Sequence, residues 1–148
     1  MTNFSEVPWI KAHIELYQRD PEKAHMWDSS AVGGPGILPT LLLTTRGRKT
    51  GAPRPLPLIY GELEGNFVVI ASKGGMPEHP LWYHNLEATP DCELRVGARQ
   101  VKALARFAEG SERARLWRRM ALIYPPYDAY QERAGKRLIP VVVLEPVS

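Results

Sequence analysis

Two short apolar runs, separated by a basic segment with two glycines, limit the possible folds of this chain more than any other feature. The first run is Leu41–Leu43, and the second extends from Leu56 to Tyr60. Apolar runs joined by a short glycine-containing connection predict a β-hairpin. The connection, residues 44–54, holds four cations and no acid. The chain is therefore expected to contain an antiparallel pair of strands with a strongly positive turn.

The composition of this turn indicates an anion-binding site. Gly47 and Gly51 allow left-handed backbone conformations and close approach of a ligand, and such turns can present several N–H groups to one anion. Arginine provides a planar fork of donors and lysine a compact charge, so Arg48, Lys49 and Arg54 suit an extended polyanion. The alternative is a solvated basic turn that discourages edge-to-edge pairing of strands.

Length and composition indicate one globular domain, because 44% of the 148 residues are apolar and 24% are charged. We assign residues 1–38 to an N-terminal helix and connector, and residues 39–148 to the barrel core. No apolar stretch is long enough to span a membrane and no secretory leader is evident, so a cytoplasmic location is expected. Cys92 is the single cysteine, which excludes an internal disulfide. No metal site is expected, and a net charge of +3 is too small to indicate a nucleic-acid-binding protein.

The N-terminal segment is predicted to form an amphipathic helix. Ser5 is expected to cap it, Ile10 and Ile14 share its apolar face, and Asp20 with Pro21 ends it. This face packs on the core in one interpretation. In the other, the helix is a lid over a ligand, or it contacts a membrane or a second subunit.

The remaining pattern predicts a mostly β protein. Residues 22–39 are expected to be a connector and residues 61–65 a hairpin loop. Helices are expected from Pro80, from Ser111 and after Pro126. Six strands are predicted, at residues 40–45, 54–60, 66–72, 93–97, 100–108 and 138–144. This order favours a six-stranded antiparallel barrel with helices at its flanks.

Two further stretches are candidates for a binding site. Ser72-Lys73-Gly74-Gly75 follows a strand and precedes a helix, where an anion or a flat ring can lie against the backbone. Trp82, on that helix, belongs either to the core or to a pocket wall. Three tyrosines then recur at every third residue and would line one side of a short helix as an apolar wall with polar tips: Tyr124, Tyr127 and Tyr130. Alternatively, these rings cap the edge of the core.

Motifs for self-contained catalysis are missing from the sequence. There is no glycine-rich dinucleotide loop, Walker loop, His-Glu-x-x-His or nucleophile elbow, and no pair of carboxylates stands in an apolar setting. An enzyme of this composition would need a cofactor to carry the chemistry.

Several motifs resemble those of the deazaflavin-dependent nitroreductase family. The similar segments occur in the same order: Leu42–Arg54, Ala71–Gly75, His79–Leu86, Tyr124–Gln131 and Ile139–Val142. The resemblance implies a split β-barrel of the FMN-binding type. It also implies coenzyme F420, an 8-hydroxy-5-deazaflavin with a phosphodiester and an oligoglutamate tail.

The resemblance also implies roles for individual residues. Arg48, Lys49 and Arg54 would hold the phosphate and the glutamate tail. Ser72, Lys73 and Gly74 would contact the deazaflavin and its ribityl arm, and Trp82 would wall the pocket. Tyr124, Tyr127 and Tyr130 would line the substrate side, with Tyr130, Ser72 or water as proton donor. Ile59 replaces a tyrosine that nitroimidazole-reducing members often carry, and Tyr60 is expected to point to the opposite face.

The resulting hypothesis is hydride transfer from reduced F420 to an electron-poor acceptor, such as a quinone, an enone or a nitroaromatic ring. One alternative is a reductase that holds FMN in the same barrel. A second is a non-catalytic protein that stores or delivers the deazaflavin. A homodimer and a peripheral membrane contact through the N-terminal helix are left open.

Overall fold

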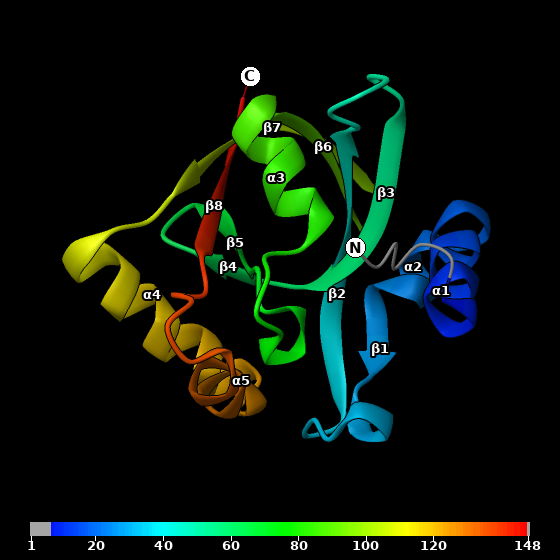
Figure 1. Cartoon of the computed structure of the whole chain (residues 1–148). Coiled ribbons are helices and arrows are strands. Elements are labelled where there is room, and N and C mark those ends of the chain that lie inside the picture. Colours follow the sequence, from blue (N-terminus) through cyan, green and yellow to red (C-terminus); the bar gives the residue numbers. More distant parts are fainter. Residues whose placement is uncertain (1–6, 148) are drawn as a thin grey trace.

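A curled antiparallel sheet forms the centre of the molecule (Figure 1). The computed structural model describes residues 7–147. Neighbouring strands follow the order β1-β2-β6-β7-β8-β5-β4, and β3 pairs with β2. The strands are β1 Met26–Asp28, β2 Ile37–Arg46, β3 Pro53–Ile59, β4 Gly61–Leu63, β5 Asn66–Ile70, β6 Asp91–Val96, β7 Arg99–Phe107 and β8 Val141–Pro146.

Helices cover the sheet on separate sides. Figure 1 shows α1 and α2 beside β1, α3 in front of the sheet, and α4 with α5 at the opposite flank. The helices are α1 Pro8–Arg19, α2 Pro21–His25, α3 Leu81–Ala88, α4 Gly110–Ile123 and α5 Pro126–Ala134, with single 3-10 turns η2 Ser30–Val32 and η3 Lys73–Gly75. The sheet therefore forms a half-barrel with flanking helices.

The central hairpin forms where the two apolar runs predicted it. Leu41 pairs with Leu58 and Leu43 with Leu56 across β2 and β3. On its other side β2 pairs with β6 through residues 42–44. Both faces of β2 are covered, since Leu41 and Leu43 lie in the core beneath α3 and Leu42 lies in the cluster under α1, so its apolar run is continuous rather than alternating.

The chain changes partner at Tyr60. β3 pairs with β2, whereas β4 pairs with β5. Tyr60 is buried against Phe67 in the core beneath α3, and its hydroxyl lies 2.7 Å from His25 Nε2. Ile59 packs against the other core, beneath α4 and α5. The prediction that Ile59 and Tyr60 point to opposite faces is confirmed.

Strand β5 separates the two main cores. Phe67 and Val69 face the core beneath α3, and Val68 and Ile70 face the core beneath α4 and α5. All four side chains are buried, as their uninterrupted apolar sequence predicted. A third, smaller cluster lies under α1.

The prediction of six strands is wrong, because the sheet has eight strands within residues 7–147. β1 lies within the predicted connector and β4 within the predicted hairpin loop 61–65. Each has only three residues, too few to show a period of two, and each depends on a partner strand: Met26 pairs with Pro39, and Gly61 with Val68.

Helix starts also differ from the prediction in two places. The connector contains the short helix α2, which begins at Pro21 after an Asp20 side chain that accepts a hydrogen bond from Lys23 N at 3.3 Å. Helix α4 begins at Gly110, and Ser111 is not its cap. The predicted cap Ser5 lies outside the described residues.

Cys92 is buried, and burial with its acidic neighbours raises the pKa of its thiol to about 12.

Candidate active site

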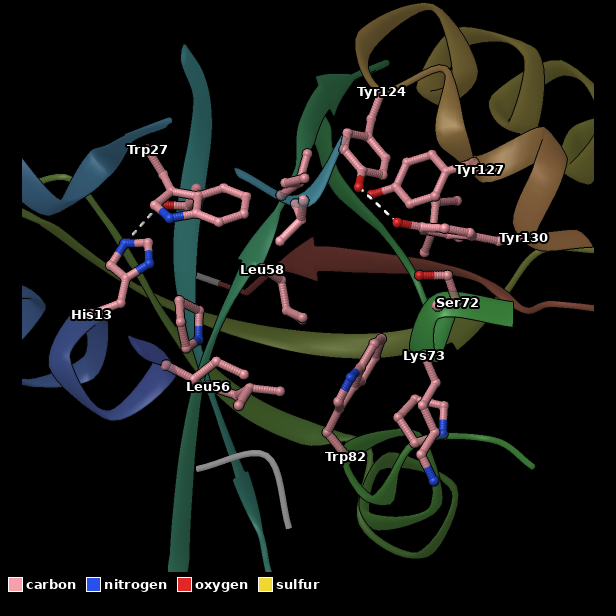
Figure 2. Close-up of a pocket in the computed structure, with 18 of the residues that line it drawn as sticks. His13, Trp27, Leu56, Leu58, Ser72, Lys73, Trp82, Tyr124, Tyr127 and Tyr130 are labelled. Carbon is pink, nitrogen blue, oxygen red and sulfur yellow. Dashed lines mark hydrogen bonds between the residues drawn. The ribbon is translucent and has the colours of Figure 1, made fainter. Parts of the chain in front are cut away.

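A pocket of about 280 Å³ opens between β3, the η3 turn and helices α1, α3 and α5. Figure 2 shows three groups of side chains around Leu58: the tyrosines, the group of Ser72, Lys73 and Trp82, and the pair of His13 and Trp27. Seven of the residues predicted from the sequence line this pocket: Ser72, Lys73, Gly74, Trp82, Tyr124, Tyr127 and Tyr130. Residues that lie up to 58 positions apart in the chain (72 and 130) thus line the same pocket.

The three tyrosines form one wall. Helix α5 begins at Pro126, as predicted, and places Tyr127 and Tyr130 on one side with Tyr124 directly before it. The hydroxyls of Tyr124 and Tyr130 lie 2.8 Å apart, and the Tyr124 and Tyr127 ring centroids are separated by 4.8 Å. Burial raises the pKa of Tyr124 and of Tyr127, so both phenols stay protonated at neutral pH and keep their capacity to donate.

The η3 turn has an unusual backbone conformation at the edge of the pocket. Three successive residues have positive φ, namely Lys73 (+47°), Gly74 (+62°) and Gly75 (+81°). Positive φ is uncommon for a non-glycine residue and occurs often at functional sites. A side chain at Gly74 would meet no atom within 4 Å, so this backbone is open to a ligand.

Lys73 contributes a buried cation to the same turn. Its side chain has no solvent exposure, and Nζ lies 2.9 Å from a carboxylate oxygen of Glu78. The hydrogen bond from Lys73 holds the pKa of Glu78 below its usual value. The Glu78 carboxylate therefore stays ionised at neutral pH beside Lys73.

Sequence reasoning missed much of the apolar lining. Leu56 and Leu58 supply the floor, and Trp9, His13 and Trp27 supply the far side. The rings of Trp9 and Trp27 stack at 5.6 Å with an interplanar angle of 9°. The two tryptophans, in or near the helix that was considered as a lid, were the only indication of this side of the pocket in the sequence. The spacing of apolar residues in α1 does not distinguish a face that packs on the core from a face that lines a pocket.

His13 is the titratable side chain on this far side. Its Nε2 lies 2.9 Å from the carbonyl oxygen of Ala24, which can only accept, so Nε2 carries the proton. Burial lowers the pKa of His13. The imidazole is therefore neutral at physiological pH and leaves the far side of the pocket uncharged.

The predicted cationic turn lies outside the pocket lining. Arg48, Lys49 and Arg54 are exposed at the tip of the β2–β3 hairpin. Gly51 has the left-handed conformation expected of it, with φ +74°. The amide of Gly51 donates to Gly47 O at 2.8 Å, and the Gly47 amide donates within the turn as well. Backbone N–H groups of both glycines are thus already used, so an anion here would be held by side chains.

Alternation along β3 connects this turn with the pocket. Leu56 and Leu58 both pack toward the core beneath α3. Since side chains two apart lie on one face of a strand, Arg54 continues that face toward the hairpin tip. An elongated molecule in the pocket would meet Arg54 where it leaves the apolar floor.

These features suit a flat ring with an anionic tail. Apolar side chains surround the space that a flat ring would fill. The hydroxyls of Ser72 and the tyrosines offer polar contacts, and the Gly74 backbone is open. Within residues 7–147, no group of three or more His, Cys, Asp or Glu side chains is arranged to hold a metal ion. None of the helices in this same range is long and apolar enough to cross a membrane.

Comparisons with known proteins agree with this geometry. Residues 17–146 match the model of the F420H(2)-dependent quinone reductase family. An F420H(2)-dependent quinone reductase of Mycobacterium tuberculosis is 42% identical over 142 residues, which cover 92% of this chain and 95% of that protein. The FMN alternative finds no support in these matches.

Two solved structures are similar in sequence and in fold. An F420-H2 dependent reductase is 41% identical with a TM-score of 0.67, over 72% of this chain and 93% of that chain. A domain-swapped dimer is 35% identical with a TM-score of 0.70, over 93% of this chain and 98% of that chain. The family match spans most of the sequence and includes every pocket residue from Trp27 to Tyr130. The chain belongs to the F420H(2)-dependent quinone reductase family.

Proposed function

We propose that this protein reduces quinones with hydride from reduced coenzyme F420. Family membership makes it an F420-dependent reductase and sets F420 as its cofactor. One observation carries the quinone assignment: an apolar floor lies opposite a wall of three hydroxyl-bearing rings. A quinone has the complementary form, a flat apolar ring with oxygens at its edge.

The ring of F420 would lie beside Trp82 and the η3 turn. Bound there, the reduced cofactor supplies a hydride. Ser72 and the Gly74 backbone would contact the polar edge of the ring, and the apolar side chains of Trp82 and Leu58 would exclude water from its faces. Holding two rings in a fixed orientation lowers the barrier, because the entropic cost of bringing them together is met on binding.

Arg48, Lys49 and Arg54 would hold the phosphate and glutamate tail. Their exposure suits a ligand that reaches the surface, and the position of Arg54 on the face of β3 that carries Leu56 supports this path. Contacts of this kind are charge-assisted and orient the ligand as well as stabilising it.

The tyrosine wall would bind the acceptor and provide a proton. In the pair formed by Tyr124 and Tyr130, one hydroxyl donates to the other, so one hydroxyl hydrogen remains available for an acceptor oxygen. Tyr130 is the less buried of the two and can regain a proton from solvent. We therefore assign the donor role to Tyr130, with Ser72 as the alternative.

Enones and nitroaromatics share the flat, electron-poor form of a quinone and would enter the same pocket. Ile59 presents no hydroxyl to this pocket. A nitro group would lack a donor at that position, so nitroaromatic reduction is expected to be slower than quinone reduction.

Two further expectations concern assembly. Trp9 is 50% exposed next to the pocket, which supports a peripheral membrane contact through α1. The domain-swapped relative supports a homodimer. Sedimentation with lipid vesicles and light scattering after size-exclusion chromatography test these two expectations, and a protein that stays monomeric and in the supernatant contradicts them.

The proposed function is tested by mixing the protein with reduced F420 and following its oxidation after adding menadione. Rapid oxidation that depends on both the protein and the quinone is expected. Reduced FMN at the same concentration serves as the control for the cofactor. Equal turnover with FMN, or cofactor binding without oxidation by any of a panel of quinones, would contradict the proposal.

A further inference from the structure

Arg137, in the loop between α5 and β8, is bound almost entirely to one segment of the chain. Its Nη2 donates to Ser72 O at 2.6 Å, its Nη1 to Ala71 O at 3.1 Å and its Nε to Met76 O at 2.8 Å. Nη1 also lies 2.9 Å from Nδ1 of His79. Every one of these acceptors belongs to residues 71–79, the segment that contains the η3 turn.

Helix α5 contacts the same turn directly. Arg133 Nη1 donates to Gly74 O at 2.9 Å, and the guanidinium lies over the Tyr130 ring. A Cβ at Gly75 would come within 2.5 Å of the carbonyl oxygen of Tyr130, so only glycine permits this approach. The backbone that would cradle a cofactor ring is thus packed on the backbone that carries the acceptor-side tyrosine.

Gln131 joins Arg137 to α5. The Gln131 amide nitrogen donates to Arg137 O at 2.8 Å, and its amide oxygen accepts from Ile139 N at 2.9 Å. Arg137 is therefore fixed at its own backbone by α5 while its guanidinium holds the η3 segment.

The η3 segment needs such support. Consecutive residues with positive φ, including the non-glycine Lys73, are unfavourable unless the surrounding structure holds them. The guanidinium of Arg137 satisfies carbonyl groups on both sides of this turn, at Ser72 and at Met76. Lysine, with a single nitrogen, could not reach this set of acceptors at once.

We propose that Arg137 is a positioning residue, which holds the η3 turn in the conformation that receives F420 and keeps this turn at a fixed distance from the tyrosine wall. The part of this proposal that concerns F420 rests on the proposed function. The part that concerns the turn rests on the hydrogen bonds alone, and the apo-protein tests it.

The experiment compares Arg137→Lys with wild type, using Arg115→Lys as the matched control. Arg115 binds Glu64 on the surface, away from the pocket. Backbone hydrogen exchange in the apo-protein is expected to accelerate within residues 71–79 and to stay unchanged in β2 and β8. The dissociation constant for F420 and the KM for reduced F420 are expected to rise about tenfold, the effect of losing one charge-assisted hydrogen bond, while the KM for menadione changes little.

A second variant separates positioning from general stability. In Arg137→Ala, added guanidinium ion at non-denaturing concentration is expected to restore part of the F420 affinity, whereas sodium at equal ionic strength is not. Acceleration of exchange throughout the sheet, an unchanged F420 affinity in Arg137→Lys, or no difference between the two salts would overturn the proposal. If wild type itself does not bind F420, the proposed function fails, and hydrogen exchange alone decides whether Arg137 holds the turn.

Discussion

The hydroxyl oxygens of Tyr124 and Tyr130 lie 2.8 Å apart across the start of helix α5. Tyr124 is buried, and its pKa is raised by burial and by this hydrogen bond. The Tyr124 phenol therefore remains protonated at neutral pH. In such a pair, one phenol can give its proton to an acceptor and receive a replacement proton from the other phenol.

Replacing Tyr130 with Phe should lower kcat for menadione reduction by about 100-fold, in the range expected for loss of a positioned general acid. The dissociation constant for F420 should stay within about twofold of wild type, because the residue is placed on the acceptor side. Stopped-flow oxidation of reduced F420 and equilibrium binding measure the two quantities. A wild-type kcat in this variant would show that Tyr130 is not the proton donor and would leave Ser72 or water in that role.

Arg54→Ala should weaken F420 binding by ~2–4 kcal/mol, the loss of two charge-assisted hydrogen bonds. The affinity of the variant should also depend less on salt concentration, since one exposed cation is removed. Arg118→Ala, which removes an exposed arginine from α4, is the control. Equal affinities for the two variants would show that the hairpin tip does not hold the cofactor tail.

Acidification should destabilise the protein through His79. Arg137 donates to Nδ1 of His79, which requires that this nitrogen be unprotonated. Burial, followed by the charges of Arg137 and His84, lowers the pKa of His79, while Glu87 opposes the shift; the ring of Tyr83 packs on the imidazole. The folded state thus binds fewer protons than the unfolded state below the unfolded pKa of about 6.5.

The stability contributed by this difference is present above pH 6.5 and is lost as the pH falls through the lowered pKa of His79. His13, whose pKa is also lowered, adds a contribution of the same sign. Urea denaturation between pH 7.5 and pH 5 should show a decline that is shallower in His79→Asn, whose amide oxygen can still accept from Arg137. A decline of equal slope in the variant would remove His79 from the explanation.

Gly75→Ala should destabilise the fold more than Gly65→Ala. Both glycines have nearly the same φ, +81° and +82°, so both variants carry the left-handed penalty of ~1–2 kcal/mol. Only at Gly75 does the new Cβ also strike the Tyr130 backbone, whereas Gly65 has no atom within 4 Å. The free energy of unfolding measured in urea should therefore be lower for Gly75→Ala by at least ~1 kcal/mol, and equal values would refute the close approach of α5 to the turn.

How much of this site can be predicted from the sequence depends on how local each signal is. Tyr124, Tyr127 and Tyr130 recur at every third residue across the start of α5, and Ser72, Lys73 and Gly74 are consecutive, so each group is visible as a motif. Their meeting in one pocket was expected from resemblance to a known family, and the structure places them there.

The far side of the pocket could not be predicted in this way. Trp9, His13 and Trp27 come from α1 and β1, and β1 exists only because β2 extends to Ile37 and pairs with it. Three-residue strands carry no periodic signal, so their partners determine them.

The turn at Gly47 and Gly51 is the opposite case. A local pattern predicted the hairpin correctly, but it did not predict that the turn would use its own N–H groups.

The central claim is that F420 and its acceptor occupy the pocket around Leu58, and filling this pocket tests it most directly. Leu58→Trp places a large ring among the lining side chains, and Leu122→Trp, at a position that is 83% exposed, is the control. Equilibrium titration with F420 should show at least a tenfold loss of affinity for Leu58→Trp and none for Leu122→Trp, with both variants folded by circular dichroism. Wild-type affinity in a folded Leu58→Trp variant would contradict the assignment of this pocket as the active site.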